Sequence, residues 1–130
     1  MDNTAGKVVL LIEDHPSIRQ LVAIVLERFG THLVLAADGL SGLEAIDAHH
    51  PDLVLLDLRL PDIDGWEVLE WVRARRSMEE LPVLIVTAYG ADGDEKRAYA
   101  AGANGYLPKP FGPESLRRAV TDLLGGCLTV

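Results

Sequence analysis

Residues 8–14 read VVLLIED, five apolar residues followed directly by two acids. In three other segments an apolar run also ends in a polar residue, namely residues 53–57 (LVLLD), 83–87 (VLIVT) and 106–109 (YLPK). Short continuous apolar runs are typical of strands that are covered on both faces, as in a parallel sheet. If these runs are neighbouring parallel strands, their polar ends meet at one edge of the sheet. Those polar ends are Glu13, Asp14, Asp57, Thr87 and Lys109.

The segments between these runs have the apolar spacing of amphipathic helices. Helices are predicted at about residues 16–29, 38–49, 64–76, 92–101 and 113–124, with a further short strand at residues 32–36. Asp38 is the expected cap of the second helix, and Asp64 with Glu67 has the spacing of a capping box for the third. Alternating strands and helices imply right-handed crossovers. We therefore predict an α/β fold, a flavodoxin-like doubly wound five-stranded parallel sheet in the order 2-1-3-4-5 with helices on both faces.

Composition limits the class of protein. The chain has 130 residues, of which 48% are hydrophobic, so we expect one domain over residues 1–130 with its core at about 7–124 and no output domain. A formal net charge of −8 argues against direct nucleic-acid binding. No apolar run approaches the roughly 18 residues that cross a bilayer, so we expect no membrane partner and a cytoplasmic location. The single cysteine, Cys127, cannot form an internal disulfide.

Three carboxylates would share the polar edge of the sheet. Two of them about 4 Å apart would repel each other by roughly 4 kcal/mol near a protein surface. Such a cluster either has raised pKa values or binds a cation, and oxygen ligands around an open crevice favour Mg²⁺. Asp57 follows the most apolar strand and is the best candidate for a nucleophile that accepts a phosphoryl group. Thr87 would add a hydroxyl group and Lys109 an ammonium group.

Each of these residues also has a plain structural interpretation. Asp57 could cap a turn, Glu13 and Asp14 could be helix-start acids, and Lys109 could be a surface lysine. Their grouping at predicted strand ends favours the functional interpretation. The bond between Lys109 and Pro110 is a candidate cis peptide, because such bonds are largely confined to proline.

Five motifs, in order and at fitting spacing, make this chain resemble the response regulator receiver domains of two-component signalling. The motifs are residues 11–14 (LIED), 55–61 (LLDLRLP), 64–65 (DG), 86–88 (VTA) and 109–111 (KPF). The resemblance extends from about residue 7 to residue 124. Glu13 stands where many members of the family have Asp. The chain is thus expected to be a stand-alone receiver domain.

The resemblance implies how the site would work. Asp57 would be the phosphoacceptor. The cofactor Mg²⁺ would be bound by the carboxylates of Glu13, Asp14 and Asp57 and by the backbone carbonyl of Arg59.

The resemblance also implies a switch and its partners. Thr87 and Lys109 would contact the phosphoryl group, and Tyr106 would turn inward as Thr87 moves. The changed surface would be the face of the fourth helix, fifth strand and fifth helix, where Lys96, Tyr99, Arg117 and Arg118 are expected. A histidine kinase or a histidine phosphotransfer protein would donate the phosphoryl group, and a downstream protein would read the result. Such a domain catalyses its own phosphorylation and dephosphorylation and is not a turnover enzyme.

Other function classes remain open at this stage. The chain could be a protein-interaction module that uses the fold without phosphorylation. A small phosphatase would need a second acid at the position of Arg59, and a flavin protein would need a Ser-, Thr- and Gly-rich loop where residues 13–16 read EDHP. His15 could ligate a metal, although a solvent-facing histidine at a helix start is the favoured interpretation.

Residues at the mouth of the predicted site also have two interpretations. Arg59 and Tyr89 could control the access of water to a phosphoryl group, or they could simply face solvent. Arg59 could also pair with Glu13 or Asp14 when no metal is bound. The loop at residues 90–93, with its two glycines, is expected to be mobile.

Overall fold

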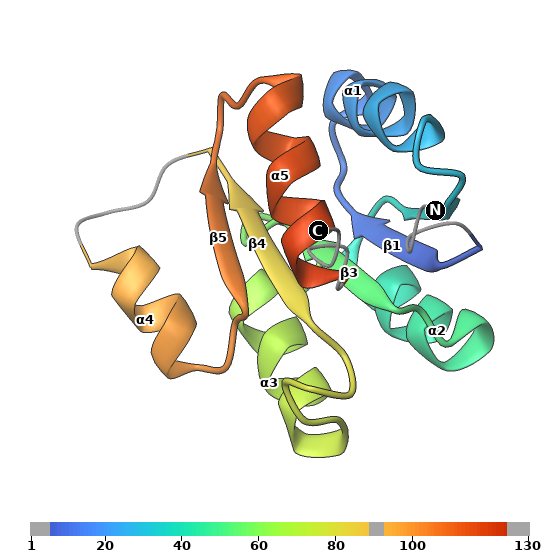
Figure 1. Cartoon of the computed structure of the whole chain (residues 1–130). Helices are drawn as coiled ribbons and strands as arrows, with labels where there is room; N and C mark the ends of the chain where they lie inside the picture. Colours follow the sequence, from blue (N-terminus) through green and yellow to red (C-terminus); the bar gives the residue numbers. More distant parts are fainter. Residues whose placement is uncertain (1–5, 89–92, 125–130) are drawn as a thin grey trace.

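The computed structural model describes residues 6–88 and 93–124, which form a five-stranded sheet flanked by five helices (Figure 1). The strands are β1 (Val8–Ile12), β2 (His32–Ala36), β3 (Leu53–Leu56), β4 (Val83–Thr87) and β5 (Gly105–Pro108). The helices are α1 (Pro16–Glu27), α2 (Gly39–His49), α3 (Gly65–Arg75), α4 (Asp94–Ala100) and α5 (Pro113–Leu123). The expectations for Tyr89, for residues 90–92 and for Cys127 fall outside the described residues.

All neighbouring strands are parallel, and their order is β2-β1-β3-β4-β5. The predicted doubly wound α/β fold is therefore confirmed. In the strand register, Ile12 lies opposite Leu56, and Thr87 lies opposite Pro108. The chain consequently leaves these four strands at the same edge of the sheet.

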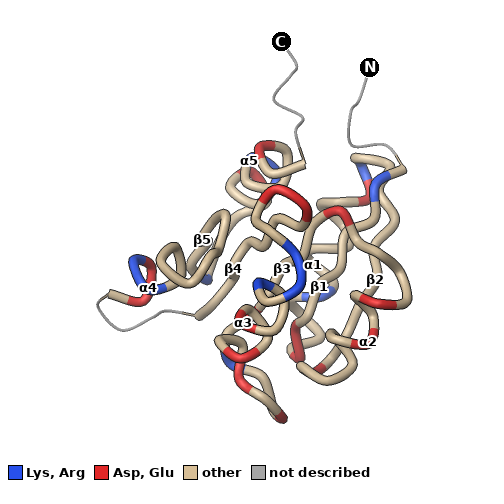
Figure 2. Tube along the Cα trace, turned by 90° about the horizontal axis from the view of Figure 1, so that it is seen from below, with Lys and Arg blue, Asp and Glu red and all other residues tan. Residues whose placement is uncertain are grey.

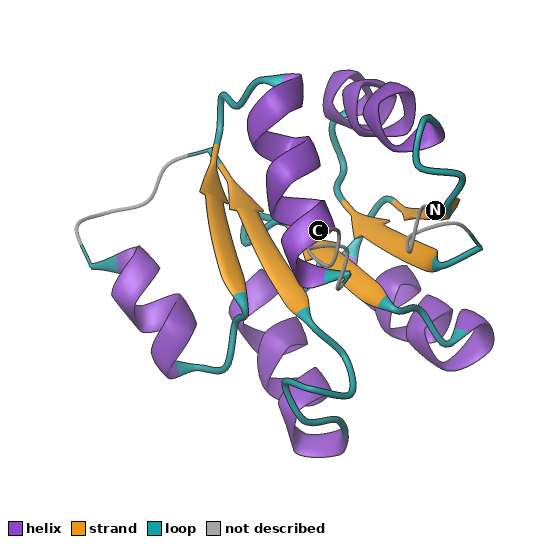
Figure 3. Ribbon diagram, in the orientation of Figure 1, coloured by secondary structure: helices purple, strands orange, loops and turns teal. Residues whose placement is uncertain are grey.

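Two hydrophobic cores, one on each face of the sheet, explain the continuous apolar runs. Successive residues of β1 point to opposite faces, so Leu10 belongs to one core and Leu11 to the other. Helices α1 and α5 cover the core that contains Leu11, whereas α2, α3 and α4 contribute to the core that contains Leu10 (Figures 1 and 3). Both leucines are 0% exposed. Burial on two faces fixes the central strands and therefore fixes the residues that follow them.

Local sequence signals explain most helix boundaries. The side chain of Asp38 accepts a hydrogen bond from the N–H of Ser41 at 2.8 Å, and Asp64 accepts from the N–H groups of Trp66 and Glu67. These bonds satisfy backbone donors that have no partner inside the first helical turn. Asp38 and Asp64 therefore act as N-caps, whereas no bond from the Glu67 side chain that would complete a capping box is found in the described residues.

Helix α1 ends earlier than the apolar pattern predicts. Its last residue is Glu27, and the N–H of Phe29 and the N–H of Gly30 each donate to the carbonyl three residues before, which tightens the chain into a turn. Gly30 has a φ of 69°, a left-handed conformation that glycine adopts without steric cost. Phe29 packs against the core from this turn, so its place in the apolar pattern reflects burial and not helical structure.

Charged residues lie mainly on the helices and loops around the sheet, with acidic residues in excess (Figure 2). Within the described part of the chain, no helix has the length and apolar character required to cross a membrane.

The contact between the start of α3 and the end of β3 generates a stability prediction. A Cβ at Gly65 would lie 2.5 Å from the carbonyl oxygen of Asp57 and 2.5 Å from the Cα of Leu58, which are both backbone atoms. We expect Gly65→Ala to lower the free energy of unfolding by about 2 kcal/mol, although alanine is the better helix former. Urea unfolding of the two proteins measures the difference.

The matched control is Gly112→Ala at the start of α5, where a Cβ would meet nothing within 4 Å. We expect this control to lose less than about 1 kcal/mol, the usual cost of a weaker cap. Equal losses at the two positions would show that the close approach of α3 to β3 is not the cause.

Candidate functional site

Four strand ends bring the predicted site residues together. Glu13 follows β1, Asp57 follows β3, Thr87 ends β4 and Lys109 follows β5. Backbone hydrogen bonds continue past the strands, because the N–H of Asp57 donates to the carbonyl of Ile12 and the N–H of Lys109 donates to the carbonyl of Thr87. The sheet itself therefore holds the backbone of the site in place.

Lys109 makes two ion pairs at the centre of the site. Its Nζ lies 2.7 Å from Oε1 of Glu13 and 3.2 Å from Oδ2 of Asp57. The Glu13 side chain is 0% exposed and the Lys109 side chain is 10% exposed, so both charges are largely removed from water. The peptide bond between Lys109 and Pro110 is cis. A buried carboxylate requires such a partner, because an unpaired buried charge is costly.

The Asp57 carboxyl is electrostatically strained. Burial raises the pKa of Asp57 above its ordinary value of 3.8, and the negative charge of Glu13 adds to the effect. The backbone N–H of Arg59, which donates to Oδ1 at 3.1 Å, and the ammonium group of Lys109 lower the pKa without cancelling the rise. Additional positive charge beside Asp57 would therefore favour its ionised form.

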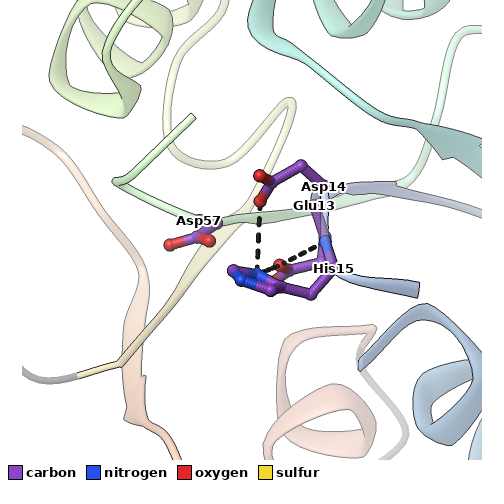
Figure 4. A group of neighbouring side chains, drawn as sticks. All are labelled: Glu13, Asp14, His15 and Asp57. Atoms are coloured by element: carbon purple, nitrogen blue, oxygen red, sulfur yellow. Dashed lines mark hydrogen bonds and ion pairs between the residues drawn. The ribbon is translucent and has the colours of Figure 1, made fainter. Parts of the chain in front are cut away.

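The remaining acid of the site has an oxygen without a hydrogen-bond donor. Oδ1 of Asp14 is buried and accepts no hydrogen bond from the described residues, and the ring Nδ1 of His15 lies 3.3 Å from it. One ligand atom from each of Glu13, Asp14, His15 and Asp57 lies within 4.8 Å of all the others (Figure 4). Three carboxylates with an oxygen left unsatisfied fit a hard divalent cation such as Mg²⁺.

The Arg59 side chain does not form the ion pair with Glu13 or Asp14 that the sequence allowed. It is exposed, and in the described residues the acids of the site pair with Lys109 and His15 instead. Lys109, which follows β5, reaches these acids across the carboxyl edge of the sheet, whereas Arg59 lies in the loop after β3. Arg59 contributes to the site through its backbone N–H.

Sequence reasoning missed Arg19 and underestimated His15. Nη1 of Arg19 donates to the backbone carbonyls of Glu13 at 3.1 Å and Asp14 at 3.2 Å, which fixes the loop between β1 and α1. His15 is solvent-facing as expected, with 64% of its side chain exposed, but its ring also contacts both neighbouring acids. The sequence did contain a signal for Arg19, because this residue lies in the first turn of a helix that follows the acids Glu13 and Asp14.

The two residues of the predicted switch lie at different depths. Thr87 is buried at the end of β4. Tyr106 lies on the adjacent strand β5, is half-buried and packs against the core beneath α2, α3 and α4. Burial, followed by the negative charges of Asp94 and Glu95, raises the pKa of Tyr106 above its ordinary value. The Tyr106 phenol is therefore kept in its neutral form.

Known proteins share this architecture. The family model of the response regulator receiver domain matches residues 9–121. The polar-differentiation response regulator DivK of Brucella ovis is 32% identical, over 92% of this chain and 97% of its own length.

Two solved structures extend the comparison. A CheY-like response regulator receiver domain protein from Methanospirillum hungatei has a TM-score of 0.84 and 28% identity, covering 94% of this chain and 96% of that one. The receiver domain of the sensor histidine kinase PA1611 from Pseudomonas aeruginosa has a TM-score of 0.82 and 32% identity, covering 93% of this chain and 99% of that one. The latter structure has a magnesium ion coordinated in its active site cleft.

The buried ion pairs generate a second stability prediction. We expect Lys109→Met, measured in the presence of a chelator, to lower the free energy of unfolding by about 3 kcal/mol, because it leaves Glu13 buried without its cation. Combining Lys109→Met with Glu13→Gln should restore part of the loss, since the unpaired charge is then removed. Denaturant unfolding of the two single variants and the double variant measures the coupling.

Lys96→Met on the exposed surface of α4 is the matched control for loss of a lysine charge. If Lys109→Met lowers the free energy of unfolding no more than Lys96→Met does, the ion pairs do not stabilise the fold.

Proposed function

This chain belongs to the response regulator receiver domain family of two-component signalling, and we propose that it accepts a phosphoryl group on Asp57. The observation that carries the proposal is the meeting of three carboxylates and one ammonium group at the strand ends. Asp57 is the acceptor because it is held by β3, flanked by Lys109 and placed beside the other two acids. The pKa of Asp57 is raised, so a bound cation would stabilise the ionised form of its carboxyl group.

The carboxylates of Glu13, Asp14 and Asp57, with the backbone carbonyl of Arg59, would hold Mg²⁺. Bound Mg²⁺ would supply positive charge to the phosphoryl oxygens during transfer. Lys109 would supply a second positive charge, since its Nζ already lies 3.2 Å from Oδ2 of Asp57. The transfer then needs little beyond in-line positioning, because an Asp57 oxygen forms the new bond to phosphorus as the donor's bond to phosphorus breaks.

The donor in this proposal is a histidine kinase or a histidine phosphotransfer protein, and the acceptor is the protein's own side chain. The domain is accordingly a self-modifying switch and not a turnover enzyme. A retained phosphoryl group adds negative charge and acceptor oxygens that could draw in the hydroxyl of Thr87 and hold Lys109. Glu13 would then have to share or release Lys109, which it contacts at 2.7 Å without phosphorylation.

The output surface of this proposal is the face formed by α4, β5 and α5, which a downstream protein would read. Thr87 ends β4, and β4 pairs directly with β5, where Tyr106 is partly exposed. Movement of Thr87 toward Asp57 would leave space that the Tyr106 ring could enter, shifting the balance between two packings of this face. Helix α4 packs against β5, so a shift of the Tyr106 ring would also change the surroundings of α4.

The acceptor role predicts the site of modification. Incubation with acetyl phosphate and Mg²⁺ should add the mass of one phosphoryl group to the wild-type protein and none to Asp57→Asn, as measured by intact-protein mass spectrometry. Asp47→Asn, an exposed aspartate of α2, is the matched control and should be modified like wild type. Equal modification of wild type and Asp57→Asn, or none in wild type, would favour a module that binds partners without phosphorylation.

The switch predicts that Thr87 transmits the signal without being the acceptor. Phosphorylation of the wild type should move amide resonances of β5 and α4 in NMR spectra. The Thr87→Ala variant should still be phosphorylated, but its resonance changes should stay near Asp57. Thr31→Ala, in the turn before β2, serves as the control and should respond like wild type. Unchanged movement of β5 resonances in Thr87→Ala would exclude this route.

A further inference from the structure

His15 contributes a nitrogen atom to the acidic pocket. Its Nδ1 lies 3.0 Å from Oε2 of Glu13 and 3.3 Å from Oδ1 of Asp14, and the backbone N–H of the same residue also donates to Oε2 of Glu13 (Figure 4). The ring belongs to the same group of four potential ligands as Asp57. His15 thus differs from a histidine that merely starts a helix at the surface.

The two carboxylate oxygens of Glu13 have separate partners. Oε1 faces Lys109 at 2.7 Å, and Oε2 faces His15. Lys109 therefore holds Glu13 with its second oxygen toward the imidazole, and the same ring nitrogen lies 3.3 Å from Oδ1 of Asp14, which accepts no hydrogen bond from the described residues. The Nδ1 atom of His15 therefore lies beside one oxygen of each of the two acids.

The spacing of these atoms fits adjacent ligands of one metal ion. Metal–nitrogen and metal–oxygen bonds of about 2.1 Å place neighbouring ligand atoms roughly 3.0 Å apart in an octahedron and about 3.4 Å apart in a tetrahedron. The observed separations of 3.0 and 3.3 Å from Nδ1 lie within this range. A divalent cation could therefore replace the contacts between His15 and the acids with small movements of the side chains.

We propose that His15 is a nitrogen ligand of the divalent cation in this pocket and makes the pocket prefer first-row transition cations to Mg²⁺. This inference rests on the proposed function, because it concerns the same acidic pocket. Carboxylate and water ligands suit Mg²⁺, whereas imidazole suits Zn²⁺ and its neighbours. Coordination uses the lone pair of a neutral ring, so the Nδ1 proton that can bond to Glu13 moves to Nε2 or to solvent on binding.

The competing explanation treats His15 as a counter-cation that screens Glu13 and Asp14 and competes with any metal. The two explanations predict opposite signs. Removing a ligand weakens the binding of Zn²⁺, whereas removing a competing cation strengthens the binding of both Zn²⁺ and Mg²⁺.

The test compares tag-free wild type, His15→Gln and the matched control His49→Gln, an exposed histidine at the end of α2. Calorimetry gives the dissociation constants for Zn²⁺ and for Mg²⁺, and pulsed electron paramagnetic resonance of bound Mn²⁺ detects coupling to an imidazole nitrogen. We expect nitrogen coupling in wild type and His49→Gln but not in His15→Gln. We also expect Zn²⁺ binding to weaken at least about tenfold in His15→Gln while Mg²⁺ binding changes by less than about twofold.

Absence of nitrogen coupling in wild type, or tighter Zn²⁺ binding by His15→Gln, would overturn the inference. Phosphorylation by acetyl phosphate with Mg²⁺ is measured on the same proteins to separate the two proposals. Modification of Asp57 without nitrogen coupling defeats only the role of His15. Nitrogen coupling without modification of Asp57 defeats the proposed function and leaves the metal site standing.

Discussion

The ammonium group of Lys109 is the charge on which the rest of the site depends. It contacts the Glu13 side chain, which is 0% exposed, and the Asp57 side chain, which is 3% exposed. Without this cation two carboxylates would be buried next to each other, and both desolvation and mutual repulsion would oppose folding. The ion pairs make an acidic pocket compatible with a stable domain. The pKa of Asp57 is still raised, so additional positive charge would favour the ionised form of this carboxyl.

In this fold the strand interiors form the packed cores, and residues at the ends of the strands form the polar site. Inside the sheet, alternate strand residues fill two apolar cores, which makes β1, β3 and β4 rigid. At the carboxyl edge the same strands end together, so polar residues only one position further along are delivered into one crevice. The two cores thus hold the strands that position the acids, and the resulting pocket suits the cation and phosphoryl group of the proposed function.

The same edge also connects the pocket to a surface. Thr87 is buried at the end of β4, while Tyr106 on the neighbouring strand is partly exposed. In the proposed switch, a change of charge at Asp57 would reach Tyr106 across two strand pairs, β3 with β4 and β4 with β5. In the loop after β1, Arg19 donates to the backbone carbonyls of Glu13 and Asp14, and the His15 ring contacts the side chains of both acids.

The sequence by itself determined the α/β class, the strand ends and the identity of the acids, because these follow from short windows: continuous apolar runs, capping residues such as Asp38 and Asp64, and acids directly after strands. It placed the end of α1 too late, since the burial of Phe29 imitates a helical pattern. Only the tertiary structure decided the pairing. Lys109 meets Glu13 across 96 positions of sequence and Asp57 across 52, Arg59 is left outside the ion pairs, and the His15 ring turns onto both acids. The physical reason is that a local pattern fixes where a side chain starts, whereas its partners depend on strand order and on which neighbouring wall offers the nearest opposite charge.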